Sequence, residues 1–122
     1  MKFLDYFSNE FETREDHYIP SLKTRYYRVR NEEAYEKIKQ VILQEKGRIK
    51  SESTNYHEIF YETPKYSAVI IYLSPKISET AIDIKVTTYR MFGLLGPGKK
   101  IIERLYQELD KVLPYKGTSL YK

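Results

Sequence analysis

Apolar residues recur along this chain at two periods, one typical of helices and the other of strands. Two segments place apolar residues three and four positions apart, which predicts amphipathic helices that each bury one face. The first begins after Asn31, its predicted N-cap, and ends at Lys46, where Gly47 is expected to supply the left-handed stop. The second follows a glycine-rich loop and ends before Pro114.

Each predicted helix has an apolar stripe that needs a sheet to cover. The stripe of the first helix consists of Ala34, Ile38, Val41, Ile42 and Glu45. The stripe of the second consists of Ile101, Ile102, Leu105, Tyr106, Leu109, Val112 and Leu113. Both helices are therefore expected to pack against apolar sheet surface.

Five further segments alternate between apolar and polar residues, or are apolar throughout, and are predicted to be strands. They are Leu22–Arg30, Arg48–Ser53, Tyr56–Tyr61, Ser67–Leu73 and Ala81–Tyr89. Turns are expected at residues 53–55 and 63–65 and from Ser74, so the last four strands should pair antiparallel. Because residues 67–73 are apolar on both faces, they are expected to form a central strand.

The order of these elements predicts one α+β domain over residues 1–122, with a core at 22–113. We expect an antiparallel sheet of four or five strands in β-α-β(3-4)-α order, with both main helices on one face. The opposite face should then show Ala68, Ile70 and Tyr72 among polar neighbours.

Both ends of the chain carry predictions of their own. Phe3, Phe7 and Phe11 recur at every fourth position, which predicts a short helix over residues 1–12, followed by a connector to residue 21. Three such rings need cover, either from the chain's own sheet or from a second subunit or another protein. The tail at 114–122 is expected to be flexible.

The order of the elements is similar to TATA-box-binding-protein-like and helix-grip architectures. The stretch DIKVTTYRMFGLLGPGKKIIERLYQEL, at residues 83–109, resembles the end of a family of small bacterial domains of unknown function. In that family a strand that ends near an Arg runs through a Gly-containing loop into the last helix. The resemblance implies a topology, and it carries no assigned activity.

The amino-acid composition excludes several kinds of active site and binding site. The 122 residues include no cysteine, which excludes disulfides, thiol catalysis and iron–sulfur clusters. The net charge of +4 comes from 21 basic and 17 acidic residues, so it permits weak attraction to phosphate or anionic lipid without requiring it. No apolar run approaches the roughly 20 residues of a membrane span, and the start lacks the pattern of a secretory signal. We expect a cytoplasmic protein with no transmembrane segment.

The glycine-rich loop GLLGPGKK, residues 93–100, fits the phosphate-loop pattern G-x-x-x-x-G-K-[ST] except that Lys100 replaces the hydroxyl residue. Too little chain follows for a phosphate-loop fold, so a turn with positive φ is expected instead. Lys99 and Lys100 would still face the free N–H groups of a helix start, an arrangement that suits an anion.

The apolar part of the same loop has two interpretations. Met91, Phe92, Leu94 and Leu95 either cap the end of the core or dip into a membrane surface or a partner. Together with Lys99 and Lys100 they form the candidate anion- or partner-binding site.

A second candidate lies in the first predicted strand. Arg25, Tyr27 and Arg28 have the composition of a nucleic-acid surface, in which aromatic rings stack on bases and cations meet phosphates. The ordinary interpretation is a solvated edge strand whose basic side chains discourage aggregation.

Catalytic and metal-binding patterns are not found in the sequence. His57 and Glu58 are adjacent in a predicted strand and so point to opposite faces, and His17 lies in the connector. Asp83 and Lys85 share a face, where an exposed ion pair is expected. We therefore expect no enzyme, no metal and no cofactor.

These patterns predict a small non-enzymatic cytoplasmic binding or protein-interaction module. Its partner would be another protein or a second copy of the chain, as a homodimer. One alternative is weak nucleic-acid or anion binding through the basic strand or the glycine-rich loop. Another is a small apolar ligand held between the sheet and the C-terminal helix.

Overall fold

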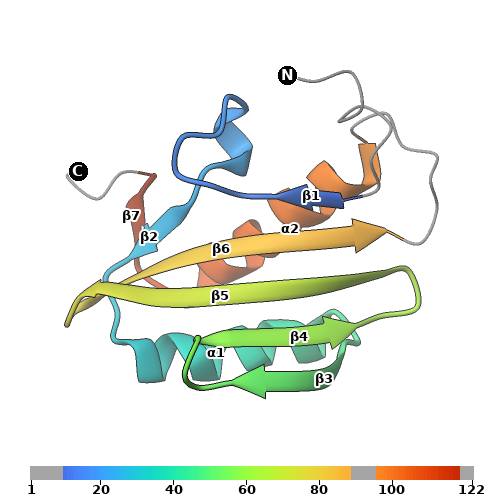
Figure 1. Cartoon of the computed structure of the whole chain (residues 1–122). Helices are drawn as coiled ribbons and strands as arrows, with labels where there is room; N and C mark the ends of the chain where they lie inside the picture. Colours follow the sequence, from blue (N-terminus) through green and yellow to red (C-terminus); the bar gives the residue numbers. More distant parts are fainter. Residues whose placement is uncertain (1–9, 89–95, 119–122) are drawn as a thin grey trace.

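The structure, a computed structural model, describes residues 10–88 and 96–118 of the chain. Its elements in chain order are β1 (Glu10–Glu12), the 3-10 helix η2 (Pro20–Leu22), β2 (Arg25–Tyr27), α1 (Asn31–Gln44), β3 (Arg48–Ser53), β4 (Glu58–Glu62), β5 (Tyr66–Lys76), β6 (Glu79–Thr88), α2 (Gly96–Val112) and β7 (Tyr115–Gly117). The strands form one antiparallel sheet in the order β3-β4-β5-β6-β2-β7, with β1 also paired to β6 (Figure 1). The predicted α+β class is confirmed, and the sheet has seven strands where four or five were expected.

The additional strands come from segments that were predicted to be helix and tail. Residues 10–12 form β1, in which Phe11 pairs with Val86 of β6, so the predicted helix is wrong over these residues. Glu10, Phe11 and Glu12 alternate with the period of a strand, and this pattern prevails over the i, i+4 spacing of the phenylalanines. Phe3 and Phe7 lie outside the described residues.

The predicted tail contains β7, which pairs with β2 along residues 115–117. The Lys116 ammonium group lies 2.9 Å from the Glu79 carboxylate, and both side chains are nearly buried. A strand held in this way is part of the sheet, so the expectation of a loose tail is wrong for these residues.

β1 and β2 lie end to end along the same edge of β6. β1 pairs with residues 85–87 of β6, and β2 pairs with residues 80–82. β2 is only three residues long, and it lies between β6 and β7 instead of forming the basic edge strand that was expected. Residues 13–24 therefore interrupt what would otherwise be one continuous strand.

Both helices cover the same face of the sheet, as predicted (Figure 1). However, the covered face is the one expected to be open: Ala68, Ile70 and Tyr72 are buried, whereas Leu73 is exposed. β5 is apolar on both faces, so its own sequence does not decide which face is covered. The neighbouring strand decides it, because Ile70 lies opposite Ile84 in β6, and the large apolar residues of β6 (Ile82, Ile84 and Val86) all lie on one face.

The start of α1 differs from the prediction by one residue, and its end, at Gln44, comes two residues before the predicted Lys46. Asn31 is the first helical residue, and Arg30 takes the N-cap position. The Asn31 side chain accepts a hydrogen bond from the Thr80 hydroxyl at 2.9 Å instead of capping the helix. At the other end, Lys46 and not Gly47 has the left-handed conformation, with φ of 61°.

Gly47 is needed because there is no room for a side chain at this position. Its N–H donates to the Ile42 carbonyl at 2.9 Å, and the Lys46 N–H donates to that of Leu43, the pattern of a Schellman helix end. A β-carbon at residue 47 would lie 2.6 Å from the Tyr61 ring. The glycine therefore allows the chain to pass close to β4.

The apolar side chains of α2 fill the space between the helix and the sheet. Ile102, Leu105, Tyr106 and Leu109 are completely buried, as its predicted stripe requires. In the described part of the chain, no helix is long and apolar enough to cross a membrane. At the far end of the sheet β5 continues to Lys76, so the turn expected from Ser74 comes later, at residues 77–78.

Candidate functional site

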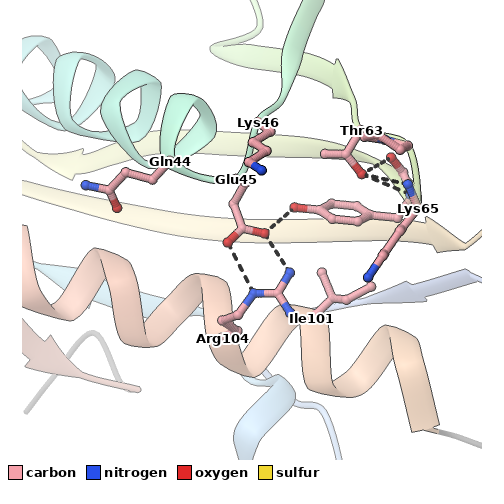
Figure 2. A pocket seen from close by; sticks show the side chains of 9 residues that line it. Gln44, Glu45, Lys46, Thr63, Lys65, Ile101 and Arg104 are labelled. Atoms are coloured by element: carbon pink, nitrogen blue, oxygen red, sulfur yellow. Dashed lines mark hydrogen bonds and ion pairs between the residues drawn. The ribbon is translucent and has the colours of Figure 1, made fainter.

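An open pocket of about 480 Å³ lies where α1, the β4–β5 hairpin and α2 meet (Figure 2). Its lining residues are Gln44, Glu45, Lys46, Thr63, Pro64, Lys65, Tyr66, Ile101 and Arg104. Residues far apart in the sequence thus converge, because both helices cover one face of the sheet, and α1 ends and α2 begins near the same hairpin. The lining combines three cations with one carboxylate and an apolar floor.

Glu45 is the centre of the polar contacts in this pocket. Its carboxylate accepts hydrogen bonds from Arg104 Nε at 3.1 Å and Nη2 at 2.6 Å, and from the Tyr66 hydroxyl at 2.8 Å. Burial would raise the pKa of Glu45, but the hydrogen bonds from Arg104 and Tyr66 outweigh it and hold the pKa below its usual value. The carboxylate stays ionised and paired at neutral pH.

The hairpin that carries Lys65 is fixed by Thr63. The Thr63 hydroxyl accepts hydrogen bonds from the backbone N–H groups of Lys65 at 3.1 Å and Tyr66 at 3.0 Å. This local arrangement is a turn that the Thr-Pro-Lys sequence predicts. It leaves the Lys65 side chain to extend from the hairpin towards α2, as Figure 2 shows.

Lys46 and Lys65 are the two cations of the pocket that remain unneutralised. Both residues are exposed, and neither ammonium group has a hydrogen-bond or ion-pair partner among residues 10–88 and 96–118. Lys46 also retains a left-handed backbone, which costs a residue other than glycine about 1–2 kcal/mol. This conformation belongs to the end of α1, where the Lys46 N–H donates to the Leu43 carbonyl.

The predicted site in the glycine-rich loop is only partly described. Met91, Phe92, Leu94 and Leu95 lie outside the described residues. Lys99 pairs with Glu103 at 2.6 Å along α2, while Lys100 is exposed one turn before Arg104. Lys99 is therefore already engaged with a carboxylate of its own helix.

Gly98 lies inside the first turn of α2, where its expected role of providing positive φ does not apply. Instead, a β-carbon at this position would lie 2.2 Å from the Phe11 ring. The strand that precedes the loop, β6, pairs antiparallel with all of its neighbours. This arrangement differs from the parallel sheet of phosphate-loop proteins.

Arg25 and Tyr27 point towards α2 and share one partner there. Arg25 Nη1 lies 2.6 Å from Asp110 Oδ2, and the fully buried Tyr27 donates to Asp110 Oδ1 at 2.7 Å. The Arg25 guanidinium also lies over the Tyr106 ring, 4.8 Å from its centre. Of the three residues of the nucleic-acid candidate, only Arg28 is exposed.

The titratable pair on β6 is not an ion pair. Asp83 accepts hydrogen bonds from the hydroxyls of Thr13 and Thr24, both at 2.6 Å. Lys85 pairs instead with Glu10 at 3.1 Å, because β1 lies beside β6. Within the described residues, no three His, Asp or Glu side chains are placed to hold a metal ion.

The two histidines lie far from the pocket. His57 has φ of 53° in the turn before β4, and its ring meets the Tyr72 ring edge-on with centres 5.4 Å apart. His17 accepts a hydrogen bond from the Ile19 N–H at 3.0 Å. Neither side chain contributes to the site.

Sequence reasoning missed the four residues that give the pocket its charge: Glu45, Lys46, Lys65 and Arg104. One signal was present, since Glu45 is the single charged residue on the otherwise apolar stripe of the first helix. A buried carboxylate needs a partner, and no local pattern identifies Arg104, which is 59 residues away.

No family model, curated protein or solved structure matches the chain. The resemblance of residues 83–109 to small bacterial domains therefore stays a prediction.

Proposed function

We propose that this protein is a small non-enzymatic binding module, and that its pocket between α1, the β4–β5 hairpin and α2 holds an anionic group of the ligand. One observation carries the proposal: Lys46 and Lys65 flank a pocket in which Glu45, the one carboxylate among the described lining residues, is already neutralised by Arg104. An entering anion would meet two unpaired ammonium groups and no free negative charge.

The rest of the lining indicates what surrounds the anionic group. Pro64, Tyr66 and Ile101 contribute apolar atoms to the lining, and the volume of about 480 Å³ exceeds what a single small ion occupies. The ligand would therefore combine an anionic group with further atoms that fill the remaining space. Both a small molecule and the acidic side chain of a protein partner have this form.

The other candidate functions have less support from the contacts. For nucleic acid, Arg25 and Tyr27 are held by Asp110 and face α2. For an apolar ligand between the sheet and α2, buried side chains such as Leu105 and Tyr106 fill that layer. Binding to a second copy of the chain stays a prediction.

The test is a titration of the protein with inorganic phosphate at low salt, in which ¹H–¹⁵N NMR spectra monitor the backbone amides. We expect saturable shifts of the amides of Lys46, Lys65 and Arg104 that weaken as salt is added. Lys65→Ala should weaken binding, whereas Lys76→Ala, which removes the same charge at the opposite end of β5, should not. Absence of saturable shifts, or equal affinity in Lys65→Ala, would contradict the proposal.

A further inference from the structure

A second hollow of about 330 Å³ adjoins the pocket on the side of β3. It is lined by Lys46, Arg48, Glu62, Thr63 and Pro64. Lys46, Thr63 and Pro64 line both hollows, so the two are contiguous across the tip of the hairpin. Lys46 stands between them and contributes its charge to each.

The two hollows together carry an excess of positive charge. Four basic side chains line them, namely Lys46, Arg48, Lys65 and Arg104, against two carboxylates. Glu45 is held by Arg104, and Glu62 makes a looser, exposed contact of 3.7 Å with Lys50, which is outside the lining. Lys46, Arg48 and Lys65 are therefore set against one weakly paired carboxylate. The exposed Arg48 has no ion-pair partner within the parts of the chain that the structure describes. One singly charged anion would leave part of this charge uncompensated.

The spacing of the cations limits the size of the ligand. Residues 46 and 48 are two positions apart, so their backbones lie at most about 7 Å from each other. A chain of two or three linked phosphates spans a comparable length, so one ligand can place anionic groups beside both Lys46 and Arg48. Among the described residues, Tyr66 is the one aromatic residue in either lining, and at 3% exposure it offers no face for base stacking.

We infer that the two hollows form one site for a ligand of the oligophosphate class, with one phosphate in each hollow and Lys46 between them. This inference rests on the proposed function, because it assigns the ligand class of the same pocket. Lysine and arginine side chains bind phosphate oxygens through charge-assisted hydrogen bonds. Two linked phosphates gain affinity over one because the second binds intramolecularly.

The experiment compares orthophosphate, pyrophosphate, tripolyphosphate and the dicarboxylate glutarate by isothermal titration calorimetry under identical salt conditions. We expect tripolyphosphate to bind about tenfold or more tightly than orthophosphate, with glutarate at the weak end of the series. Equal affinities for tripolyphosphate and orthophosphate would overturn the inference. Glutarate binding as tightly as tripolyphosphate would overturn the assignment to phosphates.

Two variants separate this inference from the proposed function. Arg48→Ala should abolish most of the tripolyphosphate advantage and leave orthophosphate affinity nearly unchanged, because Arg48 lines only the second hollow. Lys65→Ala should weaken both ligands. If orthophosphate binds at Lys65 but Arg48→Ala has no effect on tripolyphosphate, the two-hollow site is wrong and the proposed function stands. If no ligand in the series binds, both are wrong.

Discussion

The ring of Phe11 in β1 lies directly against Gly98 in the first turn of α2, so that a β-carbon at residue 98 would meet the ring at 2.2 Å. Phe11 pairs with Val86 on the covered face of the sheet, which directs its ring at the helix. The absence of a side chain at residue 98 therefore lets α2 approach β1. The contact links the first described strand to the last helix.

This contact predicts the effect of Gly98→Ala. Alanine is the better helix former by about 1 kcal/mol, but overpacking against Phe11 costs about 1–3 kcal/mol, so we expect net destabilisation in urea unfolding. The cost should shrink when Phe11→Leu removes the ring, and Gln107→Ala on the exposed side of α2 should be nearly neutral. A Gly98→Ala variant more stable than the wild type would contradict the packing.

Lys46→Gly should separate stability from binding. Glycine adopts φ of 61° without strain, so the variant should gain about 1 kcal/mol in its free energy of unfolding. It should also lose phosphate affinity, because the ammonium group between the two hollows is removed. Lys46→Ala is the matched control: it removes the same charge but keeps the strained conformation, so it should lose affinity without the gain in stability.

Asp110→Ala should destabilise the protein by about 2–3 kcal/mol in urea unfolding, because it leaves the buried Tyr27 hydroxyl and the Arg25 guanidinium without their acceptor. Tyr27→Phe removes one of these hydrogen bonds and should cost about 1 kcal/mol. As a control, Lys111→Ala breaks an exposed pair with Glu108 and should have little effect. An Asp110→Ala variant as stable as Lys111→Ala would show that the contact contributes nothing.

The sequence predicts the class of the fold because periodicity reports which residues are buried. Both helical stripes cover the sheet as expected, and the Thr-Pro-Lys hairpin joins β4 to β5. It does not predict which face of β5 is covered, since that strand is apolar on both sides and its register against β6 decides. The short strands β1 and β7 are not predicted either, because three residues are too few to show a recognisable alternation of apolar and polar positions.

The pocket is less predictable than the fold because its charges come from three separate segments. The sequence places Lys46 just before a glycine stop, but in the structure Lys46 itself is left-handed, and Gly47 lies where a β-carbon would come within 2.6 Å of Tyr61. Lys65 lies in a turn whose position was predicted, but a turn lysine is ordinary by itself. The end of α1, the β4–β5 hairpin and α2 must all pack together to bring both lysines and Arg104 to one hollow.

Glu45→Gln should make the stability of the protein less dependent on pH. The native pKa of Glu45 lies below its usual value of 4.5, so the carboxylate contributes stability above that pH and loses it as the pH falls through the native pKa. We expect Glu45→Gln to be less stable than the wild type by about 1–2 kcal/mol at neutral pH, a figure kept modest because Arg104 is half exposed.

The same comparison at acidic pH checks whether ionisation of Glu45 stabilises the folded protein. In urea unfolding across a pH series, the difference between Glu45→Gln and the wild type should shrink as the pH falls below 4.5, because a protonated Glu45 no longer attracts Arg104. Glu62→Gln, which affects a looser and more exposed contact with Lys50, should show little difference from the wild type at neutral pH. A gap between Glu45→Gln and the wild type that widens on acidification would mean that Glu45 is not held as an ionised carboxylate, and the neutralised lining on which the binding proposal depends would be wrong.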